Sequence, residues 1–318
     1  MGAEFIQQCK HRGTVFGRTL TIGRQLLFLS PRQIKKLLRT GRPGNGGKQG
    51  IGADVAWPFP AFAERLLTAM GATSVDSLDY AAYEGATVLH DLNQPLPEEL
   101  KDQWDTVIDS GTIEHVFDFP QAMRTYMELV KPGGSLILMT TANNFFGHGF
   151  YQFSAELFFR IFTRENGFDL KRIEVGEDEM LVGKLLGGWG YHVNLRGRVR
   201  EVSDPADVGS RVELVNNHGT VIMVHAIKRE SVPLFRSTPM QSDYVATWTR
   251  TTNSEKPRAD APSVVSRASL ATFAPRRWLL WAYWEVLPRI FGIIYGLLPH
   301  GWFGGKHLNN RRFYRPRG

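Results

Sequence analysis

The stretch WDTVIDSGTIEHVFD, residues 104–118, decides the fold, because a short apolar run in it ends directly in a loop of small, acidic and imidazole side chains. Residues 105–110 have the length and composition of a buried strand. A helix is predicted from Phe119 to Val130, and the following Lys131-Pro132-Gly133-Gly134 ends it, since proline and glycine stop helices. The continuous apolar run 135–141 predicts the next strand. Strand, helix and strand in this order are typical of a parallel sheet.

The same alternation of short apolar runs and helical patterns extends on both sides of this stretch. Further strands are predicted at 19–23, 74–79, 87–90, 170–175 and 221–228. Further helices are predicted from Ser30, a favourable N-cap, to about Gly41, and at 59–70 and 154–162. Apolar residues make up 42% of the 318, which is enough for a sizeable core. The sequence therefore predicts an α/β fold.

Candidate ligand-binding residues follow the predicted strands, because parallel sheets bind ligands at the carboxyl ends of their strands. Gly23 follows the first strand, Asp79 the second, Asp91 the third and Ser110 the fourth. An acid at the second strand end can accept both hydroxyls of a ribose, and an acid at the third can accept the amino group of adenine. The pair favours an adenosine-containing ligand; the alternative is that both acids only form turns, where aspartate is common.

The segment 104–118, together with the run Val130-Lys-Pro-Gly-Gly-Ser-Leu136, resembles the class I S-adenosylmethionine-dependent methyltransferases. The resemblance covers about residues 19–175 and the strand at 221–228. It implies a Rossmann-like, seven-stranded, mostly parallel sheet with helices on both faces, and S-adenosyl-L-methionine as cofactor. By this resemblance, Gly23 lies beneath the methionine part of the cofactor, Asp79 holds the ribose, Asp91 and Leu92 hold the adenine, and Ser110 to His115 face the sulfonium and the substrate.

The first loop departs from the family pattern, which usually reads Gly-x-Gly-x-Gly. Here it reads Thr21-Ile22-Gly23-Arg24-Gln25, so a single glycine remains. Arg24 and Gln25 add bulk where glycines let the backbone approach the cofactor, and the charge of Arg24 would either meet the cofactor's carboxylate or repel its sulfonium. Two functions follow: methyl transfer, or a catalytically inactive methyltransferase-like binding or assembly module.

Two histidines are candidate catalytic residues. His115 is a candidate base for a substrate hydroxyl, since imidazole titrates near neutral pH, and Glu114 is a weaker candidate for the same role. The alternative is that His115 only shapes its loop. The polar and aromatic loop 143–153 carries His148 as a second candidate base, and Tyr151 and Gln152 as candidate substrate contacts. The alternative for this loop is a helix entry capped by Ser154.

The expected reaction is methyl transfer to an oxygen or nitrogen atom of a small-molecule or glycan/lipid-linked acceptor. No metal site is predicted, because the histidines form neither a set with cysteines nor a His-Glu-x-x-His pair. Nucleic acid is an unlikely partner, since the net charge of +7 gathers mainly in a basic tail and no nucleic-acid-binding module is recognised. Cys9, the one cysteine, allows no intrachain disulfide, and the start of the chain lacks a signal-peptide pattern.

Three regions are expected along the chain. Residues 1–235 form the methyltransferase-like domain, with a loop insertion at about 177–218; residues 236–275 form a flexible linker; and residues 276–318 form a hydrophobic, aromatic segment with the basic tail. The segment 278–298 has the length of a membrane span, but Glu285, Pro288 and Arg289 interrupt it. It is interpreted either as a kinked helix on a membrane surface or as a helix packed on its own domain or a partner. The expected location is cytoplasmic, with association to a membrane in the first case.

Overall fold

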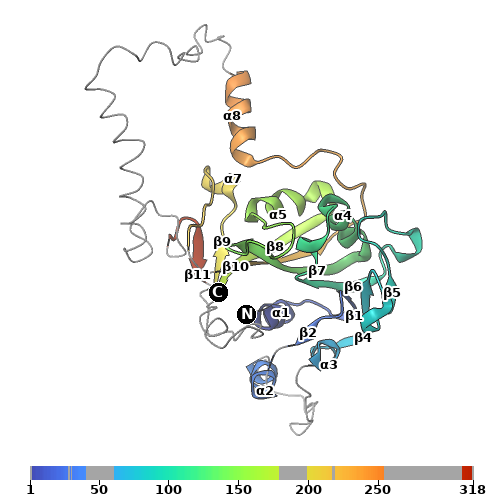
Figure 1. Ribbon diagram of the computed structural model, residues 1–318. Helices are drawn as coiled ribbons and strands as arrows, with labels where there is room; N and C mark the ends of the chain where they lie inside the picture. The colour runs from blue at the N-terminus through green and yellow to red at the C-terminus, as the bar shows by residue number, and fades with distance from the viewer. Residues whose placement is uncertain are drawn as a thin grey trace.

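A computed structural model of the chain describes residues 2–27, 29, 31–40, 61–178, 199–216, 219–253 and 310–316. Its centre is a mixed β-sheet with helices on both faces, so the predicted α/β class is confirmed (Figure 1). The predicted cap at Ser30 and the segment 278–298 lie outside the described residues, whereas Arg311, Arg312 and Arg315 of the basic tail lie within them.

The main sheet has the strand order β11-β9-β8-β10-β7-β6-β1-β4-β5. Its strands are β1 (Gly17–Ile22), β4 (Ala72–Asp79), β5 (Val88–Leu89), β6 (Trp104–Ser110), β7 (Val130–Asn143), β8 (Phe168–Asp178), β9 (Val199–Val202), β10 (Gly219–Lys228) and β11 (Tyr314–Pro316). Neighbours from β7 to β5 pair in parallel, whereas β10 pairs antiparallel with both β7 and β8. A separate pair joins β2 (Leu26–Leu27) to β3 (Ala61–Phe62).

The expected count of seven strands is corrected to nine for the main sheet in the described part of the chain. The expectation of a mostly parallel sheet is wrong, because four of its eight strand pairs are antiparallel. β9 comes from the region expected to be a loop insertion, and β11 comes from the C-terminal tail. Both pair antiparallel beyond β8, so they satisfy backbone groups that an exposed edge would leave unpaired. Composition of single segments did not reveal the pairing of β9 with β11, because it joins residues more than 100 positions apart, such as Val202 and Tyr314.

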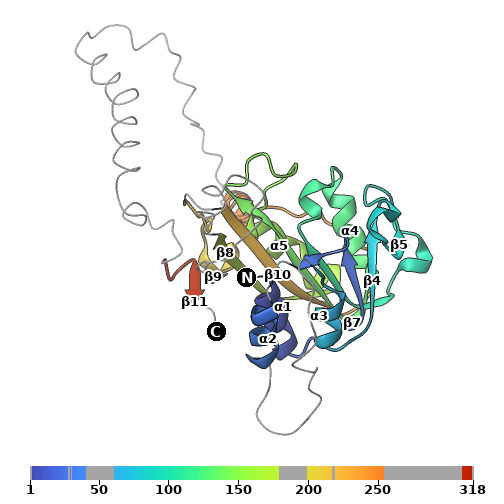
Figure 2. The ribbon, with the colours of Figure 1, turned by 60° about the horizontal axis from the view of Figure 1, so that its bottom comes forward.

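Two layers of helices cover the sheet. α1 (Gly2–His11), α2 (Pro31–Thr40) and α3 (Glu64–Ala69) lie on one side, and α4 (Phe119–Leu129) and α5 (Ala155–Ile161) on the other (Figures 1 and 2). The strands alternate accordingly: Ile108 and Ile137 pack with the first group, whereas Val107 and Leu136 pack with the second. The predicted helix at 59–70 is shorter than expected, because residues 61–62 form β3.

The remaining described helices are short, apart from α8. They are the 3-10 turns η1 (Ala82–Glu84), η2 (Glu98–Leu100), η3 (Ile113–His115) and η4 (Arg164–Asn166), and the helices α7 (Pro205–Val208) and α8 (Ser242–Asn253). α8 falls inside the expected flexible linker, so residues 242–253 are helical there instead. Its first turn is held to the domain, since Ser242 N donates to Glu156 Oε1 at 2.8 Å and Arg211 pairs with Asp243 at 2.7 Å.

Among the described residues, no helix is long and apolar enough to cross a membrane.

The order of the strands indicates one position where a ligand would bind, which we call the crevice. From β1 the chain moves outward to β4 and β5, whereas from β6 it moves the other way to β7. β1 and β6 are neighbours, so the direction of winding reverses between them. In open parallel sheets, ligands bind at the carboxyl ends of the strands at such a reversal. The loops after β1 and β6 hold Gly23 and the segment from Ser110 to His115.

Candidate active site

The loop after β6 is fixed by a buried acid, Asp109. Its carboxylate accepts hydrogen bonds from the backbone N–H of Thr112 at 2.9 Å and of Ile113 at 3.1 Å, and from the Tyr126 hydroxyl at 3.2 Å. Burial, and to a lesser degree the nearby charge of Glu114, raises the pKa of Asp109 to about 7. Asp109 therefore holds the turn that begins η3 and sets the direction of the residues after it.

Glu114 is the buried member of the site. It is 1% exposed, although it lies in a loop at the end of the sheet. Its Oε2 accepts a hydrogen bond from the Thr140 hydroxyl of β7 at 2.8 Å. This bond fixes the carboxylate and leaves Oε1 toward the loop that follows β7.

The loop after β7 closes on Glu114 through glycine. Gly147 and Gly149, on either side of His148, have φ values of +86° and +77°, which side-chain-bearing residues rarely adopt. A Cβ on Gly149 would lie 2.7 Å from the Glu114 carbonyl oxygen. That oxygen accepts a hydrogen bond from Phe150 N at 2.7 Å. The backbone therefore approaches Glu114 more closely than any side chain would permit.

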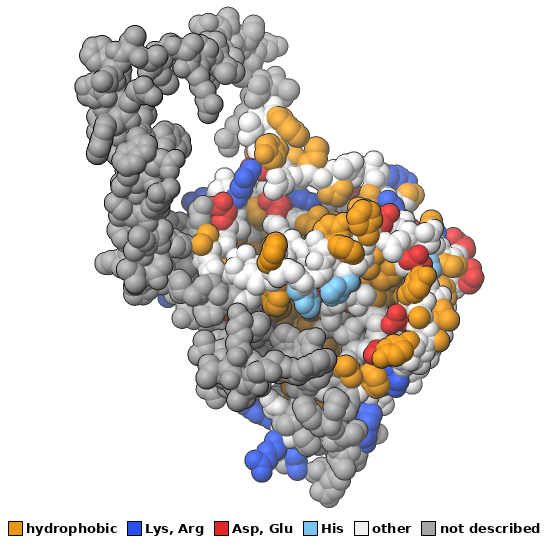
Figure 3. All heavy atoms as spheres, viewed as in Figure 1, with side chains coloured by type: hydrophobic (Ala, Val, Ile, Leu, Met, Phe, Trp, Pro, Cys, Tyr) orange, Lys and Arg blue, Asp and Glu red, His pale blue; other side chains and the backbone are white. Residues whose placement is uncertain are grey.

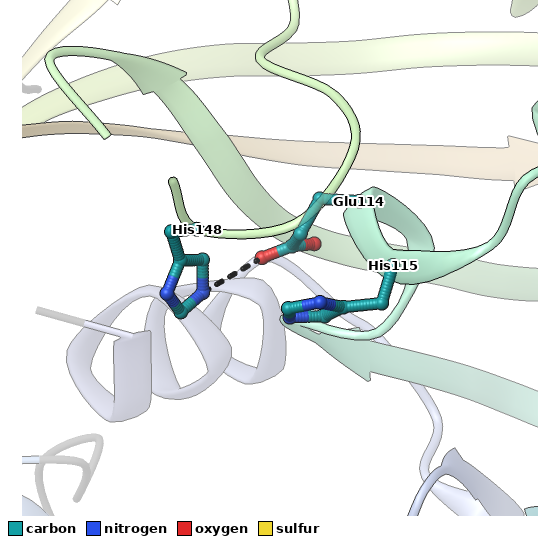
Figure 4. Close-up of side chains that lie close together, drawn as sticks. All are labelled: Glu114, His115 and His148. Atoms are coloured by element: carbon teal, nitrogen blue, oxygen red, sulfur yellow. Dashed lines mark ion pairs between the residues drawn. The ribbon is translucent and has the colours of Figure 1, made fainter. Parts of the chain in front are cut away.

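The result is a cluster of Glu114, His115 and His148, drawn in Figure 4. His148 Nε2 lies 3.7 Å from Glu114 Oε1, and the two imidazole rings meet edge to face with centroids 5.1 Å apart. One ligand-capable atom from each residue lies within 4.8 Å of the others. His115 is exposed and the His148 side chain is 46% exposed, so both rings are accessible to a substrate. The prediction of no metal site considered sequence spacing alone, and only the fold brings these three residues together.

Aromatic side chains flank the cluster in sequence, and the Phe145 ring lies 5.8 Å from the His148 ring, centroid to centroid. Phe117, Phe146 and Phe150 are 74%, 101% and 69% exposed, and Phe117 meets Phe150 edge to face. Figure 3 shows histidine side chains at the surface of this face beside hydrophobic ones. The two predicted substrate contacts hold the loop: the Tyr151 hydroxyl donates to Phe117 O at 2.6 Å, and Gln152 Oε1 accepts from Phe145 N at 2.8 Å.

Gly23 joins the two halves of the crevice. Its N–H donates to Leu78 O at 2.7 Å and its φ is +67°. A Cβ there would lie 3.3 Å from Thr112 Oγ1, and that hydroxyl donates to Ile22 O at 3.1 Å. The turn after β1 therefore packs against the loop after β6, and glycine keeps the space between them open.

The two predicted adenosine-binding acids stand at neighbouring strand ends, since Asp79 pairs with Leu89 of β5. Asp79 Oδ1 accepts from Tyr80 N at 2.7 Å, and Asp91 Oδ1 accepts from the backbone and side-chain nitrogens of Asn93, both at 2.9 Å. The bonds from Asn93 lower the pKa of Asp91. Among the described residues, Oδ2 of each acid has no hydrogen-bond partner.

Two other predicted cofactor contacts have different surroundings. The Leu92 side chain is 8% exposed and packs in the core cluster on the α4 and α5 side of the sheet. Ser110 is exposed at the last position of β6, where it is aligned with Met139 of β7.

Arg24 points away from the Gly23 turn, whereas the Gln25 side-chain amide folds back beside it, 3.7 Å from where a Cβ on Gly23 would lie. Arg24 pairs with Glu64 at 2.6 Å, donates to Glu84 O at 2.7 Å, and stacks over the Phe62 ring at 3.8 Å from its centre. The Gln25 side-chain amide donates back to Ile22 O. The charge of Arg24 is thus neutralised beside α3, and the bulk of Gln25 lies against its own turn.

Sequence reasoning missed two residues that shape the site, Asp109 and Thr140. Asp109 offered a signal, because a charged residue near the end of an apolar strand needs buried partners. Thr140 offered none, since threonine is ordinary in a strand and its partner is 26 residues away.

No protein-family model matches the chain, and no curated protein sequence matches it. Solved structures do resemble it at low identity. The YcgJ protein of Bacillus subtilis is 12% identical over 72% of this chain and 99% of that one, with a TM-score of 0.38. An S-adenosylmethionine-dependent methyltransferase of Thermotoga maritima is 15% identical over 72% and 91%, with a TM-score of 0.35. An N-methyltransferase of Haemonchus contortus, in complex with phosphomonomethylethanolamine and S-adenosylhomocysteine, is 12% identical over 71% and 52%, with a TM-score of 0.35.

Proposed function

We propose that the protein transfers a methyl group from S-adenosyl-L-methionine to an oxygen or nitrogen atom of a small-molecule or glycan-type acceptor. The observation that carries the proposal is the cluster of Glu114, His115 and His148 at the ends of β6 and β7, next to the Gly23 turn at the reversal of the sheet. The sequence resemblance to class I methyltransferases supports the same reaction.

The residues around the Gly23 turn fit this cofactor. Gly23 leaves open a space that a Cβ would fill, 3.3 Å from Thr112 Oγ1. Asp79 and Asp91 each keep one carboxylate oxygen without a partner among the described residues, which suits ribose hydroxyls and an adenine amino group. Arg24, which would have repelled a sulfonium, is paired with Glu64 instead. When bound, the cofactor supplies an electrophilic methyl group attached to a positively charged sulfur.

The cluster then acts on the acceptor. With the cofactor bound, the acceptor oxygen or nitrogen would take its methyl group, and the electron pair of the broken carbon–sulfur bond would stay on sulfur. The acceptor's proton goes to a ring nitrogen of His115 or His148, both of which are exposed. Buried Glu114 faces His148 at a distance of 3.7 Å and would stabilise the resulting imidazolium by its charge. Phe117 and Phe150 would cover the flat faces of an acceptor and exclude water.

Cofactor binding is tested by titrating the full-length protein with S-adenosylmethionine and S-adenosylhomocysteine in a calorimeter. Saturable binding of both at micromolar concentration is expected. Binding of neither at millimolar concentration would favour the inactive binding or assembly module over the enzyme.

Methyl transfer is tested with radiolabelled cofactor and a panel of hydroxylated and aminated sugars, including a lipid-linked one because of the apolar sequence 278–298. Glu114→Gln is expected to lower turnover by roughly 100-fold without changing cofactor affinity. Glu98→Gln, in exposed η2, is the matched control and should retain wild-type turnover. Equal turnover in both variants would contradict the role of the cluster.

A further inference from the structure

We propose that Glu114, His115 and His148 bind a divalent transition-metal ion, with Zn²⁺ as the best match to the donor set. Two imidazoles and one carboxylate that leave further positions open are a set that catalytic zinc sites use. Binding of the ion stands on the geometry alone, whereas its part in catalysis rests on the proposed methyl transfer.

The distances suit an ion better than a hydrogen bond. His148 Nε2 and Glu114 Oε1 are 3.7 Å apart, which is too long for a hydrogen bond. Zinc–ligand bonds of about 2.0–2.2 Å at tetrahedral angles place neighbouring ligand atoms about 3.3–3.5 Å apart. The three candidate atoms lie within 4.8 Å of one another. Small ring rotations would close the remainder, and both histidines are exposed at the surface.

Glu114 has the surroundings of a ligand whose second oxygen is already fixed. The carboxylate is buried, and buried carboxylates are paired or coordinate metals. Thr140 donates to Oε2, while no described residue donates a hydrogen bond to Oε1, which faces His148. Metal-binding carboxylates are commonly oriented by a hydrogen bond to the oxygen that does not bind the ion, and the Thr140 hydroxyl would have this role for Glu114.

The protein contributes three ligands, so an ion here keeps positions for solvent or substrate. These positions lie on the side of the exposed imidazoles. A hydroxyl bound to the ion would have a lowered pKa and would lose its proton to solvent before attack on the methyl carbon. With the ion bound, the imidazoles are ligands and not bases. This favours acceptors that chelate through the reacting hydroxyl and a neighbouring oxygen, such as vicinal diols.

Metal binding is tested on chelator-treated, full-length protein without cofactor or acceptor, by titration with Zn²⁺ and with Co²⁺, whose visible absorption reports its coordination. One equivalent is expected to bind. His148→Ala, His115→Ala and Glu114→Gln should each weaken binding at least 10-fold, and Thr140→Val about 10-fold. His11→Ala, a change of an exposed histidine in α1, is the matched control and should bind like the wild type.

The outcomes separate the two proposals. Absence of binding, or binding that is the same in His148→Ala and His11→Ala, would overturn the metal site. His148 is on the surface, so its variant is expected to fold, and thermal melting checks this. Methyl transfer that a chelator does not reduce would overturn the ion's catalytic part and leave the imidazole base in place. Metal binding without cofactor binding would overturn the enzyme and retain the metal site.

Discussion

The two halves of the crevice are built differently. At the ends of β4 and β5, Asp79 and Asp91 are held by their own neighbours, one and two residues further along. At the ends of β6 and β7, Glu114 is held by Thr140 and by the backbone of Phe150, from a second strand and a second loop. The first half consists of local turns, whereas the second is assembled by tertiary packing.

This difference predicts how each half responds to substitution. A carboxylate in a local turn can lose one interaction without moving its neighbours, so changes there should affect ligand binding alone. A buried carboxylate held by contacts from other segments cannot lose one of them without moving its neighbours. Interiors are close-packed, so a shift at one contact displaces the others. Of the following four changes, three test the comparison and one tests the sheet outside the crevice; they run from the largest expected effect to the smallest.

Gly149→Ala is expected to have the largest effect, because its Cβ would lie 2.7 Å from the Glu114 carbonyl oxygen. Gly147→Ala is the matched control: its φ is similarly positive, but no atom lies within 4 Å of its Cβ. The control should lose about 1–2 kcal/mol of stability from backbone strain alone. Gly149→Ala should lose clearly more, together with metal binding and turnover. Denaturant unfolding measures the loss of stability in both variants. Equal losses would show that the loop does not depend on the contact between residue 149 and Glu114.

Acid should destabilise the sheet away from the crevice through His225 in β10. Burial first, and then the charges of Lys171, Arg172 and Arg12, lower the pKa of His225 to about 4. The folded state therefore prefers the neutral ring, so its full contribution is present above pH 6.5, the ordinary value, and is lost as pH falls from 6.5 to 4. The loss amounts to about 3 kcal/mol.

The measurement is the free energy of unfolding between pH 4 and 7. His225→Gln should show a flatter pH dependence than the wild type, and His11→Gln, an exposed control, should not. If the unfolding free energy of His225→Gln depended on pH as steeply as that of the wild type, the acid sensitivity would come from other groups. The result also shows whether a loss of activity at low pH comes from unfolding or from a change at the candidate site.

Asp91→Asn should weaken cofactor binding and leave the fold unchanged. The amide oxygen can still accept from Asn93, but the group in place of Oδ2 can no longer accept a hydrogen bond. Affinity for S-adenosylhomocysteine is expected to fall about 10-fold, with turnover at saturation and melting temperature unchanged. Unchanged affinity for S-adenosylhomocysteine would mean that Asp91 only stabilises its own turn and does not contact the cofactor.

Arg24→Ala should have the smallest effect. Arg24 is engaged by Glu64, Glu84 and the Phe62 ring, so its removal should cost at most about 1 kcal/mol of stability. Cofactor affinity should change less than twofold, because the guanidinium is directed away from the Gly23 turn. A gain in affinity of 10-fold or more would show that Arg24 opposes the cofactor, as the sequence alone allowed.

The sequence predicted the alternating core of the fold. The strands around residues 19–23, 74–79, 105–110 and 135–141 and the helix from Phe119 were found close to their predicted positions. These elements are visible because apolar periodicity, proline and glycine act over a few residues. The sequence did not predict α1, α8, or the pairing of β9 and β11.

The sequence by itself determined which residues lie at the strand ends, and with them Gly23, Asp79, Asp91 and the loop holding Glu114 and His115. Only the tertiary structure decided that Arg24 turns toward Glu64 and that His148 meets Glu114 from a loop 34 residues away. The reason is physical. Strand ends follow from local backbone preference, whereas charge pairing and close approach depend on which segments the packed sheet brings together.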